Sequence, residues 1–308
     1  MSERRRGGWV CRGIRWGGDG AGLVWGRGSE RRVRGLEREL ELGFRVVGVR
    51  GCPGARGNVC PLGAVIGGRS TGGLCAECAR LDRAHSVAAD TVADDPRTYR
   101  VYLAWFGPGM VKVGITAEER GPARLLEQGA VVFGWLGRGP LMAARRTEEL
   151  LRTALGVPDR IPYARKRAVR SALPPRAERT AEIEELYGRA VALEGWPQSL
   201  ERVAFTAVDH AGVFGLDGLA PATGVVSELV EGGQVVGRLV AAAGPDLHLA
   251  TADGGLVVLD TRLMTGWELV GPGEGGGTGE GGGTEGSGGA ITVPVRGLSG
   301  GDVQDGLF

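Results

Sequence analysis

Four cysteines fall within a short part of the sequence, in the spacing Cys52-x7-Cys60-x14-Cys75-x2-Cys78. Four thiolates suit a tetrahedral structural Zn²⁺ site, and the CxxC end is the usual knuckle, where two thiolates converge on one ion. Glycines near both ends of the cluster allow the backbone to fold tightly around a metal. Two alternatives remain, namely four ordinary buried thiols or a site in which His85 replaces Cys60.

A second group of residues that could do chemistry lies in VYLAWFGPGMVKVGIT, residues 101–116, which contains Lys112, one of only two lysines in the chain. Two short apolar runs flank a Gly-Pro-Gly turn and predict a β-hairpin. Counting from the turn places Tyr102 opposite Gly114 and Ala104 opposite Lys112. Side chains alternate between faces, so one face is an apolar core face. We expect the other face to be a surface, with Gly114 leaving room for a group to approach the strand.

The elements that follow the hairpin position two further candidates. The sequence Thr116-Ala-Glu-Glu119 fits a capping box and predicts the start of a short helix, which restarts around Arg124. After a strand, a helix is predicted from about Pro140 to Leu155. Glu148 falls on the inward stripe of that helix, where a carboxylate is costly unless it is paired or bound to a metal. Pairing with Arg145 or Arg152 is the alternative to a metal.

These residues resemble the GIY-YIG nuclease fold in a divergent form. Tyr102 within VYL, then Lys112-Val113-Gly114, an arginine, and a helix with Glu148 follow that family's order of hairpin, helix, strand, helix. The cysteine cluster, VYLAWF…VKVGIT and RLLEQGA also look like a bacterial zinc-knuckle family of unknown function, a similarity that covers roughly residues 40–270.

The nuclease resemblance implies a role for each matching residue. Tyr102 matches the first motif tyrosine, and Glu148 matches the carboxylate that binds one divalent metal, usually Mg²⁺. Arg124 matches the arginine that steadies the phosphate, with Arg120 as the alternative. Lys112 stands where the second tyrosine is expected. It could bind phosphate as a point charge, or act as a base if burial lowered its pKa.

Charge is distributed unevenly along the chain, although its net value is only +1. Residues 1–180 carry 32 basic and 18 acidic side chains, whereas residues 181–308 carry 5 and 18. A basic surface attracts phosphates, and arginine can bind them in a bidentate manner. We therefore expect a nucleic acid as partner, DNA first, contacted by Arg120, Arg145 and Arg146. A solvated arginine-rich surface is the alternative.

The sequence has no run of about 18 apolar residues that would predict a transmembrane helix. Its basic start lacks the apolar core of a secretory signal. We therefore expect a cytoplasmic protein without a membrane partner, whose cysteines are reduced or metal-bound. Cys11, outside the cluster, is predicted to be a core residue.

The predicted fold class is α+β. The expected parts are a β-rich N-terminal segment (1–51), the zinc knuckle (52–85), the GIY-YIG-like α/β sandwich (98–170), a helix with a small β domain (181–270) and a flexible Gly-rich tail (271–308). The last residues of that tail fit either a tail or a returning strand.

Three functional hypotheses follow. The first is a metal-dependent endonuclease with a structural Zn²⁺ and a catalytic Mg²⁺. The second is a non-catalytic zinc-containing module that binds nucleic acid. The third is a structural or regulatory protein that the zinc site only stabilises. We find no catalytic triad and no organic-cofactor fingerprint in the sequence.

Overall fold

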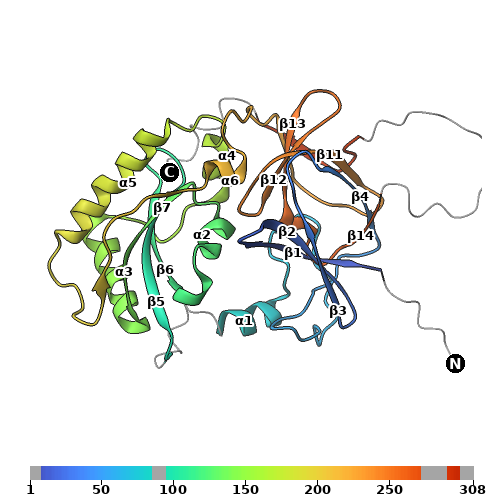
Figure 1. Cartoon of the computed structure of the whole chain (residues 1–308). Coiled ribbons are helices and arrows are strands. Elements are labelled where there is room, and N and C mark those ends of the chain that lie inside the picture. Colours follow the sequence, from blue (N-terminus) through green and yellow to red (C-terminus); the bar gives the residue numbers. More distant parts are fainter. Residues whose placement is uncertain (1–7, 85–94, 272–289, 299–308) are drawn as a thin grey trace, which may run out of the picture. The chain divides into compact units, whose positions relative to one another are not determined.

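The computed structural model describes residues 8–84, 95–271 and 290–298. These residues form two compact units (Figure 1). Within the described ranges, the first unit combines the residues up to Arg83 with those from Ala222 onward, and the second is Ala84–Pro221. Helices and strands both build the fold, so the predicted α+β class is confirmed. Within the described ranges, no helix has the length and apolar character needed to cross a membrane.

The first unit is built on one ten-stranded sheet. In their order across the sheet, its strands are β15 (Val295–Gly297), β10 (Gly224–Val226), β13 (Leu256–Asp260), β12 (Asp246–Ala250), β11 (Gln234–Ala243), β4 (Glu41–Val47), β14 (Glu268–Val270), β1 (Val10–Gly17), β2 (Gly20–Arg27) and β3 (Glu30–Gly35). Only the β10–β13 pair is parallel among these described strands. In β4, buried Leu42, Phe44 and Val46 alternate with more exposed residues, as in a strand covered on one face.

This sheet joins parts of the sequence that lie far apart. Strand β4 pairs with both β11 and β14, and β1 also pairs with β14. The β-rich segments predicted within residues 1–51 and 181–270 thus contribute to the same sheet. Of the two alternatives for the end of the chain, β15 is a returning strand, because it pairs with β10. The described residues of this unit also form the helices α1 (Ala76–Ala84) and α7 (Thr261–Met264).

The loop that carries the cysteines is fastened to the rest of the unit by Arg50, whose side chain is only 1% exposed. Its guanidinium donates hydrogen bonds to the carbonyl oxygens of Gly67 (2.8 Å), Ser70 (2.6 Å), Arg262 (2.8 Å) and Thr265 (2.8 Å). The first two carbonyls belong to the cysteine loop, and the other two belong to α7 and the residue after it. A buried cation is costly unless it is hydrogen-bonded, and these four carbonyls give each of the three guanidinium nitrogens a partner.

The second unit is a sheet with helices packed against it (Figure 1). The strand order is β6 (Val111–Ala117), β5 (Thr98–Trp105), β7 (Val132–Pro140) and β8 (Glu201–Arg202), and β9 (Val208–Asp209) pairs with β7. The helices are η1 (Glu118–Arg120), α2 (Ala123–Gln128), α3 (Leu141–Leu155), α4 (Tyr163–Val169), α5 (Arg176–Val191) and α6 (Ala211–Phe214). The predicted order of hairpin, helix, strand and helix corresponds to β5–β6, α2, β7 and α3.

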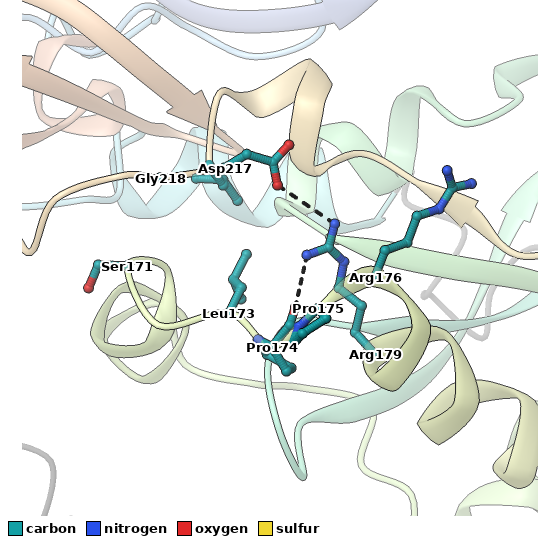
Figure 2. Close-up of a pocket in the computed structure, with 9 residues that line it drawn as sticks. Ser171, Leu173, Pro174, Pro175, Arg176, Arg179, Asp217 and Gly218 are labelled. Carbon is teal, nitrogen blue, oxygen red and sulfur yellow. Dashed lines mark hydrogen bonds and ion pairs between the residues drawn. The ribbon is translucent and has the colours of Figure 1, made fainter.

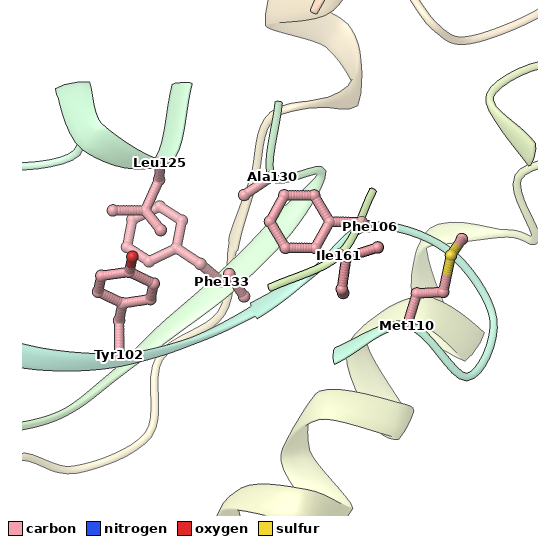
Figure 3. Close-up of a cluster of buried hydrophobic side chains, with 8 residues drawn as sticks. Tyr102, Phe106, Met110, Leu125, Ala130, Phe133 and Ile161 are labelled. Carbon is pink, nitrogen blue, oxygen red and sulfur yellow. The ribbon is translucent and has the colours of Figure 1, made fainter. Parts of the chain in front are cut away.

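The predicted hairpin register is confirmed. Tyr102 pairs with Gly114 and Ala104 pairs with Lys112, while the amide of Phe106 donates to the carbonyl of Met110 across the turn (2.9 Å). The expectation that the Tyr102 face is an exposed surface is wrong, since Tyr102 and Ala104 are buried. That face packs into an apolar cluster (Figure 3) made of Tyr102, Ala104, Phe106, Met110, Leu125, Ala130, Phe133 and Ile161.

The faces differ from the prediction because elements that follow the hairpin cover the second face. Leu125 of α2 and Ile161, just before α4, both belong to the cluster. The opposite face, with Val101, Leu103 and Trp105, is buried as predicted. The central strand β5 is therefore buried on both sides, as in a sheet that has helices on both faces.

The structure corrects one local prediction and confirms another. Thr116 does not cap a helix, because β6 continues to Ala117 and Thr116 pairs there with Arg100. Only the short helix η1 follows, and it has no side-chain cap. The later helix is as predicted, since α3 begins after Pro140 and ends at Gly156 in a left-handed conformation.

We expect Arg50→Met to release the cysteine loop, because four backbone carbonyls would lose their donor at a cost of at least about 2 kcal/mol. Hydrogen–deuterium exchange at the amides of Gly51, Cys52 and Ile66 should become faster. Amides of β5 in the other unit should keep their protection, and the exposed-site variant Arg38→Met should behave as the wild type. Unchanged exchange in the cysteine loop would show that Arg50 does not hold it.

Candidate functional site

The four predicted zinc ligands come together in the first unit. The Sγ atoms of Cys52, Cys60, Cys75 and Cys78 all lie within 4.8 Å of one another. The Sγ atoms of Cys60 and Cys75 are 3.7 Å apart. Four sulfurs about 2.3 Å from a tetrahedral zinc ion lie about 3.8 Å from each other, so this separation fits a zinc ion between them. The chain thus has a four-cysteine cluster that could bind zinc.

The local backbone explains why the cluster forms. Cys75 immediately precedes α1 and Cys78 lies in its first turn, so the partly positive helix N-terminus faces the sulfurs. The amide of Cys75 donates to Cys52 Sγ at 3.2 Å. Backbone hydrogen bonds, that of Ala64 foremost, lower the pKa of the Cys60 thiol to about 6, whereas burial raises the pKa of Cys78 to about 12. Amide-to-sulfur hydrogen bonds favour the thiolate form that a metal needs.

Three further predictions concerned the glycines near the cluster, the alternative ligand His85, and Cys11. Gly54 has φ of 80°, and a Cβ there would overlap the carbonyl of Asn58, so the tight turn needs glycine. His85, the alternative ligand, lies outside the described residues. Cys11 is fully buried in the core, as predicted, and burial raises its pKa to about 11.

A second candidate site lies at the outer edge of the sheet in the second unit, where β6 is the edge strand. The loop after α3 passes along this edge, and the amide of Val113 donates to the carbonyl of Pro158 at 3.3 Å. Lys112 is half-buried there. Its Nζ donates to the carbonyl of Asp159 at 3.1 Å and lies 5.9 Å from the centre of the Tyr102 ring.

The electrostatic surroundings of Lys112 involve the other predicted site residues. Burial lowers the pKa of Lys112 to about 8, and the positive charge of Arg124 acts in the same direction. Glu148 and Asp159 act in the opposite direction. The arginine and the carboxylate predicted for this site are therefore both near enough to influence the lysine.

Tyr102 fills the space that the sequence left open. Its side chain is 1% exposed, and a Cβ at Gly114 would overlap the Tyr102 hydroxyl. The expectation that Gly114 makes room for an approaching group is therefore wrong, because glycine makes room for the tyrosine ring itself. The Tyr102 hydroxyl accepts a hydrogen bond from Gln128 Nε2 at 3.0 Å, and burial raises its pKa.

Glu148 is half-buried on α3, and burial is the main reason that its pKa is raised. The charges of Lys112 and then Arg145 lower that pKa, whereas Asp159 raises it. Arg152, one of the alternative partners, instead pairs with Glu149 at 2.7 Å. Glu148 is thus a carboxylate whose charged form is only partly compensated by nearby cations.

The predicted phosphate-binding arginines are placed differently from one another. Arg120 makes two 2.7 Å hydrogen bonds to the carboxylate of Glu127. Arg124 is exposed and reaches the same carboxylate only at 3.7 Å, so it is the freer of the two and acts on Lys112. Arg145 is half-buried near Glu148, and Arg146 is exposed.

Sequence reasoning missed two residues, Gln128 and Lys166, that form a chain of hydrogen bonds to Tyr102. Gln128 donates to the tyrosine hydroxyl, while its backbone carbonyl accepts a 3.0 Å hydrogen bond from Lys166 Nζ. Lys166 is buried and lies 3.7 Å from the centre of the Phe106 ring. The rarity of lysine in this chain was the only signal, because Lys166 is the other lysine.

The second unit also contains a pocket that none of the predicted residues lines (Figure 2). Its buried Arg179 binds Asp209 at 2.7 Å and the carbonyl of Pro174 at 3.1 Å, and it lies 3.8 Å from Asp217. Arg176 lies at the pocket, 4.0 Å from Asp209. Two carboxylates thus balance the two guanidinium groups, which gives the pocket no net preference for an anion.

Comparison with known proteins places the chain by its sequence. Residues 41–269, well over half of the chain, match the family "Protein of unknown function (DUF2797)". No curated protein and no solved structure gives a significant match. The matched region begins in β4 and ends in β14, so it includes both the cysteine cluster and the Lys112 site. The chain therefore belongs to the DUF2797 family of proteins of unknown function.

Proposed function

We propose that the second unit is a divergent GIY-YIG-like phosphodiesterase that cleaves nucleic acid, DNA first, and that the first unit holds a structural Zn²⁺. The observation that carries this proposal is the grouping of Lys112, Arg124 and Glu148 at the edge of β6, above the buried Tyr102. The element order of hairpin, helix, strand and helix supports it as well.

Glu148 is the proposed carboxylate for a divalent cation. Burial raises its pKa, and the neighbouring Asp159 adds a second negative charge. A half-buried carboxylate beside another acid fits a hard cation such as Mg²⁺, which prefers oxygen ligands. When bound, the ion would stabilise negative charge that develops on the phosphate.

Lys112 is the proposed base. An ordinary lysine is almost fully protonated at neutral pH, with a pKa of about 10.4. Because burial lowers the pKa of Lys112 to about 8, about one amine in ten is neutral at pH 7 and about half are neutral at pH 8. The neutral amine can accept a proton from water, and the Tyr102 ring, 5.9 Å from Nζ, forms part of the apolar surroundings of the amine.

A specific observation favours a second function, a zinc-containing module that binds nucleic acid without cleaving it. The hydroxyl of Tyr102 is buried, is hydrogen-bonded to Gln128 and has a raised pKa. It is therefore poorly suited to activate water. In this alternative Lys112 and Arg124 only bind phosphate. A structural or regulatory role, the third hypothesis, needs neither binding nor cleavage.

The zinc assignment predicts one equivalent of zinc per chain in protein purified without added metal or chelator. Cys78→Ser should lose the metal, because three thiolates cannot complete the tetrahedral site. Cys11→Ala should retain it, since Cys11 lies outside the cluster. Elemental analysis of the three proteins measures this, and less than half an equivalent in the wild type would rule out the zinc site.

The catalytic assignment predicts cleavage of a DNA panel, both branched and plain, with Mg²⁺ or Mn²⁺. Glu148→Gln should lower the cleavage rate by at least about 100-fold, a typical size for losing one catalytic group. Glu149→Gln is the matched control, because this neighbour on the same helix is exposed and pairs with Arg152. Salt-sensitive binding without cleavage of any substrate would favour the non-catalytic module.

The base assignment predicts a pH dependence. Only the deprotonated amine accepts a proton. The cleavage rate should therefore rise with pH and level off above about pH 8, because the pKa of Lys112 is about 8. Lys112→Arg keeps the positive charge but cannot deprotonate in this range. This variant should therefore bind DNA as the wild type does and lose cleavage. If it retained both the rate and the pH profile, Lys112 would be a phosphate-binding charge and not a base.

A further inference from the structure

The hairpin formed by β2 and β3 in the first unit is a concentrated basic surface. All six residues of the edge strand β3 are exposed, and three of them are Arg31, Arg32 and Arg34. Over residues 8–35 the chain has 6 arginines and 2 acidic residues. Within the described part of the chain, neither Arg32 nor Arg34 has an acidic partner, whereas Arg27 pairs with Glu30 at 3.0 Å.

Two guanidinium groups are held together on one face of this hairpin. A Cβ at Gly26 would lie 2.8 Å from Arg12 Nε and 3.0 Å from Arg31 Nη1, so both side chains cross over this glycine. Burial lowers the pKa of Arg12, and the nearby charge of Arg31 lowers it further. Arg12 is anchored by a 2.5 Å hydrogen bond to the carbonyl of Pro53, next to the first cysteine of the cluster. Such a pair of like charges becomes favourable when an anion lies between them.

A tryptophan organises the arginines on the other face. The guanidinium carbons of Arg27 and Arg32 lie 4.7 Å and 4.0 Å from the centre of the Trp9 ring. Stacking on an aromatic ring restricts a guanidinium without using its N–H donors. Arg27 still uses one donor in its ion pair with Glu30, whereas the donors of Arg32 have no acidic partner among the described residues and are available to a ligand. The hairpin therefore presents ordered guanidinium groups on both faces of a strand.

Arginines on an edge strand also protect the edge from pairing with another chain. That role needs one or two charges. It does not require the Arg12–Arg31 pair over Gly26 or the stack on Trp9. The combination fits a ligand that carries many regularly spaced anions, since planar guanidinium groups match phosphate oxygens in a bidentate manner. The major groove of a DNA duplex also accepts a two-stranded β-ribbon.

We propose that the β2–β3 hairpin, with Arg12 beside it, binds the phosphodiester backbone of double-stranded DNA. This inference rests on the proposed function for the identity of the polymer. It assigns the binding to the zinc-containing unit, so binding and cleavage are properties of different units.

The test compares the full-length wild type with the triple variant Arg31→Ala/Arg32→Ala/Arg34→Ala. A matched control, Arg165→Ala/Arg176→Ala/Arg189→Ala, removes three exposed arginines from the second unit. Binding of a labelled DNA duplex is measured without divalent cations across a salt series. Each lost phosphate contact reduces the slope of log affinity against log salt by about 1. The hairpin variant should therefore lose about 2–3 from that slope and at least about 10-fold in affinity at low salt, and the control should lose neither.

The outcomes separate this inference from the proposed function. Unchanged binding by the hairpin variant, with zinc content intact, would overturn the inference and leave any Glu148-dependent cleavage standing. Loss of binding with normal cleavage of saturating DNA would support it. Equal affinity of the wild type for polyglutamate would overturn it in favour of an acidic protein partner, and equal affinity for single-stranded DNA would overturn the duplex assignment. A wild type that binds no DNA at low salt would refute both proposals.

Discussion

Burial of β5 on both faces is the constraint on which the second unit depends. Because α3 and α5 pack against this sheet and Leu125 and Ile161 cover its other side, the central strand leaves no face for polar chemistry. The outer edge of β6 is a place where charged groups can lie beside the sheet without entering its core. Lys112 lies there, with its Nζ 5.9 Å from the centre of the buried Tyr102 ring and hydrogen-bonded to the carbonyl of Asp159 in the loop that passes the edge.

The first unit differs, since its cysteine loop buries only a small cluster around Ala55, Cys60 and Cys78 while Val59, Leu62 and Val65 are exposed. Arg50 fastens that loop through four carbonyls, and Arg12 adds a link to Pro53 from the sheet. Hydrogen bonds therefore connect the sheet to the loop that carries the cysteine cluster. A metal bound by the four sulfurs would stabilise the loop directly, and the same loop would help to fix Arg12 beside Arg31.

Local signals in the sequence were enough for several features. The Gly-Pro-Gly turn fixed the β5–β6 register, Pro140 and Gly156 marked the ends of α3, and cysteine spacing identified the cluster. Features that depend on segments far apart in the sequence could not be predicted from the sequence. Whether the Tyr102 face is covered depends on Leu125 and Ile161, and the ten-stranded sheet depends on pairs between β1 or β4 and strands more than 180 residues later. Arg50 could not be recognised because its partners are backbone carbonyls, which carry no sequence signal.

The half-buried edge site also explains why lysine is a reasonable residue where the resemblance leads one to expect tyrosine. Desolvation disfavours the charged form of any group, so it raises the pKa of a phenol and lowers the pKa of an ammonium. Tyr102 and Lys112 illustrate the two directions within one site. Burial thus makes a tyrosine a worse proton acceptor near neutral pH and makes a lysine a better one. If the edge of β6 transfers protons, its burial favours an amine over a phenol for that role.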